Sequence, residues 1–501
     1  MGAYGRVLGA PETLALGVAA NREPPRLHAF DRYGHRTDWV EFHPAYHRLM
    51  ALQVGQGIHA SPWSEPRAGA HVHRAAGLYL SSQVEAGTSC PISMTYAATP
   101  VLMNAPELQA WLPKLFSRSY DPAHRPVGEK TGALVGMGMT EKQGGSDVRA
   151  NTTTAQPRGA PGPGQPYGIT GHKWFMSAPM CDAFLILAQA PRGLSCFFLP
   201  RWTPDGGLNG LRFQRLKDKL GNRSNASSEV EFEDATGWLV GEEGRGVPTI
   251  IEMVGYTRLD NVVGSAGLQR QALVQALHHA RHRTAFQRRL VDQPLMTAVL
   301  ADLALEVEAA TALAFRLAGA FDREDPAEVL FRRLVTPAAK FWVCKRGPML
   351  AAEALEVLGG NGYVEDSGLP RLYRELPVYS IWEGSGNVMC LDVLRAVRRE
   401  PKTLDALAAE LDLARGADTR LDRAADRTLD AMRGVVAEAG LRSLCRELVV
   451  AVQAGLLVRH APAFVAEGFL ASRLGGSGGV FGLLPDGLGL HAILARAWPG
   501  D

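Results

Sequence analysis

The sequence predicts an α+β protein made of an N-terminal helical domain, a middle β-barrel-like domain, a C-terminal four-helix bundle and an extra helical C-terminal domain. Three observations support this order. Apolar residues recur at three- and four-residue spacing before residue 136 and after residue 240, which is typical of amphipathic helices. Between these regions, short β-rich segments are separated by Gly, Pro and Asp turns. Residues 400–501 return to a helical composition rich in Ala, Leu, Arg and Asp.

The first predicted domain, residues 1–135, contains no clear run of alternating polar and apolar residues. We therefore expect it to be helical. Helices are predicted over residues 70–80, 91–103 and 106–116, where apolar side chains fall on one helical face.

The second predicted domain, residues 136–240, has a sequence pattern that is typical of a compact β-domain. Strands are predicted over residues 168–171, 183–188, 194–199 and 228–233. In the last of these, Val230 and Phe232 alternate with glutamates, which is the pattern of a half-buried strand. Residues 157–166 are rich in Pro and Gly and cannot pair as a strand, so they should form an exposed loop.

The third predicted domain, residues 241–399, contains long amphipathic patterns with short links, which predict a bundle of four helices. These patterns cover residues 247–286, 294–321, 326–358 and 387–399. We expect the first to be interrupted near Gly255 and the third to end at Gly359 and Gly360. Residues 400–501 form the fourth predicted domain.

Composition narrows the class of protein. With 501 residues and 46% hydrophobic content, the chain is long enough for several domains and is not a disordered polymer. A net charge of +2 creates no strong overall field for nucleic acid or an anionic membrane. No apolar run is long enough to span a bilayer, so no membrane role is expected. The six cysteines are widely spaced without a Cys-x-x-Cys pair, which indicates reduced thiols in the cytoplasm and no zinc site.

Three short segments carry the strongest functional signal: residues 137–147, 171–177 and 380–387. The first two are rich in small residues with amide and hydroxyl groups, which suits a flat, heteroatom-edged ring with a phosphate tail. The third places one carboxylate, Glu383, in a glycine-flanked turn. A flat redox ring beside a lone base indicates chemistry that removes a proton and a hydride from neighbouring carbons.

These motifs and their order resemble the acyl-CoA dehydrogenase family and, in detail, its AidB-type branch, which is associated with the adaptive response to alkylation. Residues 139–147 resemble the flavin loop of the family, and residues 383–385 resemble its base-bearing turn. Residues 30–36, 141–145 and 216–224 are similar to the AidB branch. The resemblance covers about residues 28–399 and implies a flavoprotein with FAD, an acyl-CoA or related thioester as substrate, and a homotetramer in which FAD spans a subunit boundary.

The resemblance implies FAD contacts for residues in several separate segments. Arg283 and Phe286 are expected to meet the FAD diphosphate of a neighbouring subunit, although Gln287 stands where the family usually has Gly. The full set of expected FAD contacts is Met137, Thr140, Gly145, Ser146, Trp174, Phe175, Met176, Ser177, Arg283, Phe286, Gly359, Gly360, Ser380, Ser385, Gly386 and Asn387.

Each of these segments also has a simpler interpretation. The flavin loop can be a Gly-rich β-turn, and the aromatic residues of the second segment can be core. An Arg near a helix C-terminus is favourable without a ligand. Residues 359–360 can form a helix C-cap and residues 385–387 a helix N-cap, and both functions are compatible with FAD contacts.

Glu383 is the residue that we expect to abstract the substrate α-proton, on the face opposite the flavin N5 that takes the β-hydride. A carboxylate in water is a weak base, so we expect the acyl chain and Trp382 to shield it. The resemblance implies that the Glu383 backbone N–H and a ribityl hydroxyl polarise the thioester oxygen. One branch of the family carries its base at the position of Thr257, which cannot act as one. A glutamate that caps the next helix is the alternative for Glu383.

Arg258 has three open interpretations. It can orient Glu383, bind the substrate or form an ordinary salt bridge inside the bundle.

The AidB resemblance raises an alternative function: a flavoprotein that binds double-stranded DNA and protects it against alkylation damage, with weak or vestigial dehydrogenation. From residue 400 onward the chain has 11 basic and 13 acidic residues, so this region lacks the positive charge that phosphate binding needs. The candidate DNA contacts Arg420, Arg423 and Arg427 share one helical face. Asp426 and Asp430 lie three residues after the last two, so intrahelical ion pairs are the favoured explanation of this stripe.

Overall fold

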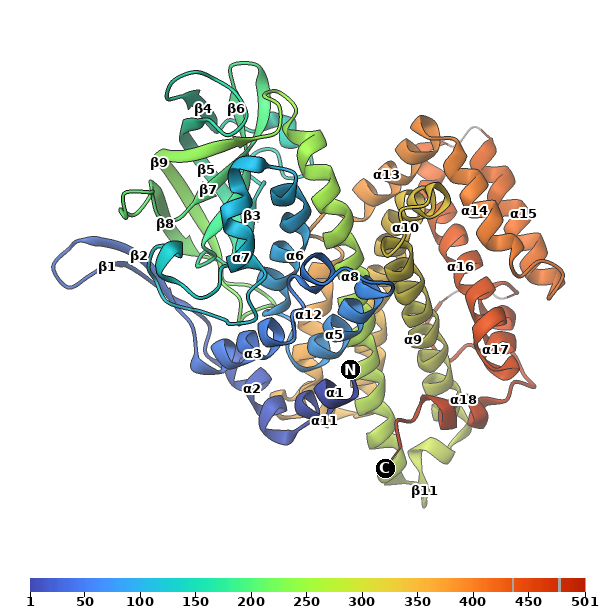
Figure 1. Cartoon of the computed structure of the whole chain (residues 1–501). Helices are drawn as coiled ribbons and strands as arrows, with labels where there is room; N and C mark the ends of the chain where they lie inside the picture. The colour runs from blue at the N-terminus through green and yellow to red at the C-terminus, as the bar shows by residue number, and fades with distance from the viewer. Residues whose placement is uncertain (435–436, 476–478, 501) are drawn as a thin grey trace. The chain divides into compact units, whose positions relative to one another are not determined.

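The computed structural model describes residues 1–434, 437–475 and 479–500. By its internal contacts the chain divides into two compact units, Met1–Thr257 and Arg258–Asp501. The boundary falls inside a long helix, and each unit is described by itself. Figure 1 labels most of the helices and strands of both units.

Helices make up most of the N-terminal part of the first unit (Figure 1). The helices predicted over residues 70–80 and 91–103 are confirmed as α5 (Ala70–Val84) and α6 (Ser89–Met103). The segment predicted over residues 106–116 is helical too, as a 3₁₀ turn (Pro106–Trp111) and the short α7 (Leu112–Leu115). The other helices here are α1 (Gly2–Leu8), α2 (Pro11–Arg22), α3 (Pro44–Gly55) and α4 (Ser61–Ser64).

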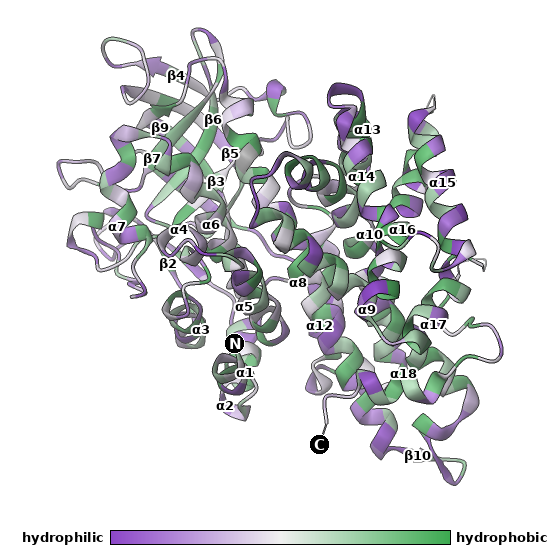
Figure 2. Ribbon diagram, turned by 45° about the vertical axis from the view of Figure 1, so that its right-hand side comes forward, coloured by the Kyte–Doolittle hydropathy of each residue, from purple (hydrophilic) through white to green (hydrophobic). Residues whose placement is uncertain are grey.

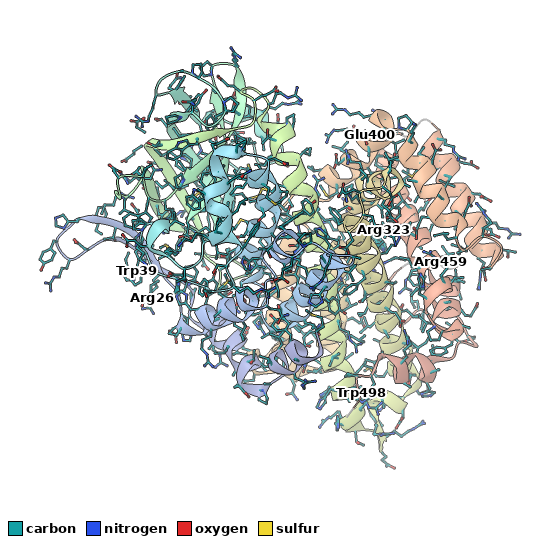
Figure 3. The ribbon with its side chains drawn as sticks, viewed as in Figure 1. Arg26, Trp39, Arg323, Glu400, Arg459 and Trp498 are labelled. Carbon is teal, nitrogen blue, oxygen red and sulfur yellow. The ribbon has the colours of Figure 1, made fainter. Side chains whose placement is uncertain are left out.

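The prediction that this region lacks strands is wrong. Strands β1 (Arg26–Phe30) and β2 (Arg36–Glu41) form an antiparallel hairpin that projects as an arm in Figure 1. Figure 3 labels Arg26 and Trp39 where the arm joins the rest of its unit. Most of its side chains are at least partly exposed, so no strict alternation marks the strands in the sequence. Asp38 ties the hairpin to the barrel, because its carboxylate accepts the Phe213 N–H at 2.9 Å.

The middle of the first unit is a closed β-barrel, as predicted. The strands β6 (Ala183–Ala190), β4 (Thr154–Pro157), β5 (Pro166–Ser177), β9 (Ser227–Val240) and β7 (Gly193–Pro200) pair in this order, and β7 pairs with β6 to close the ring. Strand β3 (Val135–Gly138) extends the sheet in parallel beside β6, and β8 (Leu211–Leu216) pairs with β9.

Burial along the strands follows the predicted pattern. Val230 and Phe232 are buried in β9 while Glu231 between them is exposed. Strands β6 and β7 are buried along almost their whole length and supply much of the barrel interior. The Pro- and Gly-rich segment between β4 and β5 is a loop, as predicted, but the two ends of the predicted loop are paired, Pro157 with Tyr167 and Pro166 with Trp238. The barrel therefore gives the segments at residues 137–147 and 174–177 a rigid support.

The long helix α8 (Gly246–His282) crosses the boundary between the units. The predicted interruption near Gly255 is wrong, since the helix is continuous through this residue. A glycine costs a helix about 1 kcal/mol, and this is a small penalty beside the burial of Met253, Tyr256 and Leu259 around it. Helices α9 (Pro294–Phe321), α10 (Pro326–Val357) and α13 (Gly386–Arg399) confirm the other long patterns.

Helix α12 (Leu369–Tyr379) was not predicted and lies between α10 and α13 in the chain. Prolines at positions 370 and 377 obscure its pattern in the sequence. Helix α10 is central in the second unit, because it packs against α9, α12, α13, α14 (Lys402–Asp412) and α16 (Leu441–His460). The segment between α12 and α13, residues 380–385, is called the base turn below.

The C-terminal region is helical, as predicted. It contains α14, α15 (Thr419–Arg433), α16, α17 (Ala463–Arg473) and α18 (Leu490–Ala497). Figure 2 shows hydrophilic and hydrophobic residues interleaved along α15. A partly buried ion pair joins this region to α9, because Glu410 accepts from Arg316 at 2.7 Å. Within the region, Glu410 also accepts from Arg459, which Figure 3 labels, at 2.5 Å. Within the described residues, no helix is long and apolar enough to cross a membrane.

Candidate functional site

The segment after β3 is a loop between two strands, as predicted, and it is anchored at its start. Thr140 pairs with Phe175 in an isolated antiparallel bridge, and the Trp174 N–H donates to the Thr140 carbonyl at 2.8 Å. The Asn151 side chain donates to the Met139 carbonyl at 2.9 Å. These bonds bring the first two predicted motifs together on one side of the barrel.

A buried ion pair fixes this loop to the barrel. The Lys173 ammonium lies 2.7 Å from the Glu141 carboxylate, and both side chains are almost fully buried. Glu141 also accepts the Thr152 N–H at 2.6 Å, and Lys173 donates to the Leu187 carbonyl at 2.8 Å. Burial alone would raise the pKa of Glu141, but Lys173 and the hydrogen bonds lower it to about 2. The sequence analysis missed Lys173, whose only signal is a lysine at a buried strand position.

One glycine of the loop is required by geometry. Gly144 has φ +93°, and a Cβ there would lie 2.4 Å from the Asn151 amide oxygen. Gly145 has no such positive φ, and a Cβ there would make only an ordinary contact with Thr140. Gly145 and Ser146 are exposed, while Thr140 and Met137 are half-buried. The loop thus presents small residues to solvent on a fixed backbone.

The second motif ends strand β5, as predicted. Phe175 is 49% exposed beside Thr140, whereas Met176 is fully buried inside the barrel. The Ser177 hydroxyl lies 3.2 Å from the Ser227 hydroxyl. The ammonium of Lys217 lies 3.4 Å from the centre of the Trp174 ring, in a cation–π contact. An exposed aromatic ring and adjacent hydroxyls therefore stand next to the loop, while the Met176 side chain is turned away from them.

The base turn lies in the second unit and has an unusual backbone. Glu383 is half-buried and adopts φ +58°, the left-handed region that non-glycine residues rarely occupy. Gly384 follows with φ +102°, and a Cβ there would lie 2.5 Å from the Met389 methyl group. Ser385 takes the N-cap position of α13, so Glu383 is not the capping residue. Gly386 begins the helix and is buried.

Three side chains from α8 and α10 hold the base turn. The Arg258 guanidinium donates from Nε to the Glu383 carbonyl at 3.2 Å, and the Lys340 ammonium donates to the Gly384 carbonyl at 2.8 Å. The Trp382 indole N–H donates to the Asn261 side-chain oxygen. The sequence analysis missed Asn261 and Lys340, which carry no signal in the sequence because each is an isolated polar residue in a helix.

Arg258 combines two of its three predicted roles. It contacts the backbone of Glu383 and forms an ion pair with Asp392, 2.6 Å from Nη1. Arg333 and Arg395 also pair with Asp392, at 3.1 and 2.9 Å. Burial would raise the pKa of Asp392, but Arg258 and Arg333 hold it below its usual value. Nothing in these contacts assigns a substrate to Arg258, so that role stays a prediction.

The remaining predicted residues around the base turn have contacts of their own. The Ser380 hydroxyl donates to the Pro377 carbonyl at 3.0 Å. Exposed Asn387 accepts from Arg442 at 3.3 Å. Gly359 has φ +58° just after the end of α10, and Gly360 begins the short α11 (Gly360–Tyr363). The predicted end of the helix at these glycines is thus confirmed, with Leu358 as the C-cap residue, and FAD contacts for these residues stay predictions.

Arg283 and Phe286 lie at a tight hairpin after α8. Strands β10 (Thr284–Ala285) and β11 (Arg288–Arg289) are joined by Phe286 and Gln287, with φ +51° and +62°. The replacement of the family's Gly by Gln287 therefore still permits a two-residue turn. Phe286 is 93% exposed, an extreme value for a large apolar side chain.

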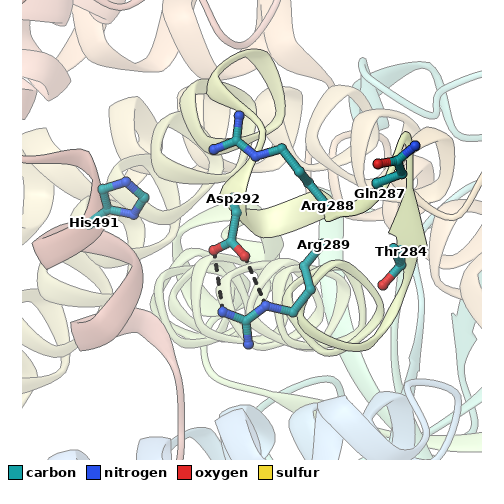
Figure 4. A pocket seen from close by; sticks show the side chains of 6 residues that line it. All are labelled: Thr284, Gln287, Arg288, Arg289, Asp292 and His491. Atoms are coloured by element: carbon teal, nitrogen blue, oxygen red, sulfur yellow. Dashed lines mark hydrogen bonds and ion pairs between the residues drawn. The ribbon is translucent and has the colours of Figure 1, made fainter.

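An open hollow of about 530 Å³ lies beside this hairpin (Figure 4). It is lined by Thr284, Gln287, Arg288, Arg289, Asp292 and His491. Arg289 is paired with Asp292 at 2.9 Å, whereas Figure 4 shows Arg288 extending away from this pair. Arg283 is exposed but does not line the hollow.

The candidate DNA arginines are not arranged as the sequence predicted. Arg420 pairs with Asp418 at 2.7 Å and with Glu467 at 2.5 Å. Arg423 and Arg427 are exposed, but the predicted intrahelical pairs do not occur among the described residues. Asp426 pairs with Arg415 at 2.8 Å, and Asp430 lies 3.8 Å from Arg433. The long arginine side chains on this exposed face can reach several carboxylates, so helical spacing alone does not select the ion pairs.

The chain is similar to known proteins over almost its whole length. Three family models match: the adaptive response protein AidB N-terminal domain over residues 1–122, the acyl-CoA dehydrogenase middle domain over 136–235, and the acyl-CoA dehydrogenase C-terminal domain over 244–398. The putative acyl-CoA dehydrogenase AidB of Escherichia coli K12 is 50% identical, over 96% of this chain and 88% of that protein.

One protein sequence and one crystal structure from Caenorhabditis elegans are also similar. Acyl-CoA dehydrogenase family member 11 is 31% identical, over 87% of this chain and 72% of that protein. The crystal structure of ACDH-11 in complex with C11-CoA superposes with a TM-score of 0.82 at 27% identity, covering 98% of this chain and 85% of that one.

Proposed function

Because the chain belongs to the acyl-CoA dehydrogenase family, in its AidB branch, we propose that it oxidises an acyl-CoA thioester with FAD as its cofactor. The observation that carries this proposal is the base turn. It presents one carboxylate, Glu383, on a left-handed backbone, and the carbonyls of Glu383 and of the residue after it are held by half-buried Arg258 and buried Lys340. The C11-CoA bound by the C. elegans structure supports the thioester class.

The residues of the flavin loop fit the cofactor. Thr140 and Ser146 supply hydroxyls, exposed Gly145 leaves the backbone accessible, and Phe175 supplies an exposed aromatic surface beside them. The buried Glu141–Lys173 pair keeps these groups in place. When bound, FAD supplies the acceptor for the hydride that leaves the substrate β-carbon.

The other half of the reaction belongs to Glu383. The substrate α-carbon–hydrogen bond breaks, the proton passes to the Glu383 carboxylate, and the bonding electrons become the second bond between the α- and β-carbons. The substrate loses a proton and a hydride and is oxidised to the enoyl thioester. The backbone N–H of Glu383 is the proposed donor to the thioester oxygen, which carries negative charge as the proton leaves.

An anaerobic titration tests this function. The purified holoprotein is mixed with saturated acyl-CoAs of increasing chain length while the flavin absorbance is followed. Glu383→Gln should slow flavin bleaching at least about 100-fold, because general-base catalysis contributes at least that much, and should leave FAD bound. Exposed Glu356 provides the matched control, and Glu356→Gln should bleach at the wild-type rate. Bleaching of Glu383→Gln at that rate would refute the base assignment.

Several finer proposals follow from the same family membership. We propose that α8, α9, α10 and α13 form the four-helix bundle. Two hydrogen bonds support this arrangement: the Gln269 side chain on α8 donates to a backbone carbonyl of α10, and a thiol of α10 donates to the backbone carbonyl of Asn261 on α8. The domain division at residues 135, 240 and 399 and a cytoplasmic location are proposals as well.

Exposed Phe286 supports a homotetramer, because an apolar side chain at the tip of a hairpin is stabilised when a neighbouring subunit buries it.

Binding of double-stranded DNA stays the alternative function. Its support is limited to exposed Arg423 and Arg427, since Arg420 is occupied by two carboxylates. A mobility shift with duplex DNA at low salt, lost in the doubly reversed variant Arg423→Glu with Arg427→Glu, would favour it. The absence of a shift at low salt would reject it.

A further inference from the structure

Helix α10 places a second buried cation beside the base turn. Lys340 is 1% exposed, and its ammonium donates to the carbonyl of Gly384, the residue that follows the proposed base. Arg258, from α8, donates to the carbonyl of Glu383 itself. Two successive carbonyls of the base turn are therefore each held by a positively charged donor.

This backbone needs such support. A non-glycine residue in the left-handed region, such as Glu383, costs about 1–2 kcal/mol. A hydrogen bond that involves a charged group contributes about 1.5–3 kcal/mol. The donors on the two carbonyls can thus outweigh the backbone cost and keep the turn in one conformation.

Lys340 and Arg258 differ in what compensates their charge. Arg258 is neutralised by Asp392, which it shares with Arg333 and Arg395. No salt bridge of Lys340 falls within the described part of the chain. Burial of an ammonium group is costly when no carboxylate is paired with it directly, so the bond from Lys340 to the Gly384 carbonyl is kept against a cost in folding free energy.

We propose that Lys340 is a positioning residue for the dehydrogenation: by holding the Gly384 carbonyl, it fixes the direction in which the Glu383 carboxylate meets the substrate α-carbon. The inference rests on the proposed role of Glu383. It does not place Lys340 on the substrate or on FAD.

The chemistry of the ammonium makes this contact sensitive to pH. Burial lowers the pKa of Lys340 to about 8. Cys344, on the same helix, and Glu383 oppose this shift, while Arg258 and Lys345 add to it. Above this pH a neutral amine is a weaker donor to the Gly384 carbonyl. The first-order rate of flavin reduction should therefore fall above pH 8 while the acyl-CoA concentration at half-saturation stays nearly constant.

Two substitutions and a control test the inference in the holoprotein. Lys340→Met should reduce the saturating rate of flavin bleaching by about 10- to 100-fold, as expected when a reacting group is misplaced by about 1 Å, with little change in half-saturation. Lys340→Arg should restore most of the rate and remove the fall above pH 8, because arginine stays charged. Exposed Lys402 supplies the control Lys402→Met, for which the wild-type rate and pH profile are expected.

A second readout does not depend on turnover. Amide hydrogen exchange in a peptide that covers residues 380–387 should become at least about tenfold faster in Lys340→Met than in wild type, since the turn loses one of its anchors. Peptides from the barrel should exchange unchanged. Unaltered exchange at the base turn, or an unaltered ratio of saturating rate to half-saturation in Lys340→Met, would overturn the inference.

The two proposals fail in different ways. If no acyl-CoA bleaches the wild-type flavin, the proposed function is wrong, and the hydrogen-exchange comparison still decides whether Lys340 holds the turn. If wild type is active and Lys340→Met retains both its rate and its slow exchange, only the positioning role is wrong. If Lys340→Met does not fold, the pH profiles of wild type and Lys340→Arg decide whether Lys340 has the positioning role.

Discussion

Two buried lysines, one in each unit, support the candidate functional segments in different ways. In the first unit, Lys173 is paired with Glu141 at 2.7 Å and holds the flavin loop to the barrel. In the second unit, Lys340 donates at 2.8 Å to a backbone carbonyl of the base turn. Burial lowers the pKa of both ammonium groups, but at Lys173 the ion-paired Glu141 carboxylate opposes the shift, whereas an ammonium bound to a neutral carbonyl becomes a weaker donor when it loses its proton. The flavin loop is therefore expected to be a fixed scaffold. The bond that supports the base turn, in contrast, is expected to respond to pH.

The largest expected effect comes from breaking the paired lysine. Lys173→Met leaves the Glu141 carboxylate buried without its cation, which should lower the free energy of unfolding by about 3–5 kcal/mol. Denaturant unfolding followed by barrel tryptophan fluorescence measures this. The double variant Glu141→Gln with Lys173→Met should recover part of the loss, since no charge remains buried. A loss below about 1 kcal/mol in the single variant would contradict the scaffold role.

His59 extends the comparison to a buried group that has no carboxylate partner among the described residues. Burial lowers the pKa of His59 to about 4, so the folded state keeps it neutral while the unfolded chain takes up a proton near pH 6.5. Its contribution is fully present above pH 6.5 and is lost as the pH falls from 6.5 to 4. The total loss should be about 3 kcal/mol, from about 1.4 kcal/mol per pKa unit.

His59→Gln isolates this effect. The amide can keep the bond that the His59 ring makes to the Ser117 carbonyl, but it does not titrate. Unfolding free energies at pH 7 and pH 5 should therefore differ by less in His59→Gln than in wild type. Identical pH dependence in the two proteins would show that His59 is not kept neutral.

Lys340 should matter less for stability than for rate. Burial lowers its folded pKa below the ordinary 10.5, so the cost of the buried charge is full below about pH 8 and is relieved as the pH rises to 10.5. At pH 7, Lys340→Met removes this cost and also removes the donor to Gly384, so the net change should stay within about 1 kcal/mol. Thermal or denaturant unfolding checks it. If Lys340→Met lowered the free energy of unfolding as much as Lys173→Met does, the proposed difference between the two lysines would be wrong.

The smallest expected effect compares two left-handed residues. The Glu383 carbonyl accepts a side-chain donor, whereas Gln287 occupies the same backbone region at the tip of an exposed hairpin. Gln287→Gly should stabilise the second unit by about 0.5 kcal/mol, because relief of the left-handed strain exceeds the entropy that glycine adds to the unfolded chain. Denaturant midpoints are precise enough to detect this. A destabilised Gln287→Gly would mean that the Gln287 side chain supports the hairpin.

Local sequence patterns predicted most helices and strands, because the spacing of apolar residues reflects which face of an element is buried. Helix α9 has the predicted bounds, and β6, β7 and β9 lie where short β-rich runs were found. The exposed hairpin of β1 and β2 was missed because neither of its faces is consistently apolar. Helix α12 was missed because its prolines are residues that usually indicate a loop.

The sequence by itself determined the family, the order of helical and β-rich regions, and the segments that carry the candidate chemistry. Its short motifs also contain Gly144 and Gly384, whose positions admit no side chain. Only the tertiary structure decided how these segments are held. Arg258 contacts a carbonyl 125 residues away, and Lys340 one 44 residues away. Such partners share no local spacing, since they meet only when separate helices pack, and a single buried lysine looks in the sequence like any other polar residue.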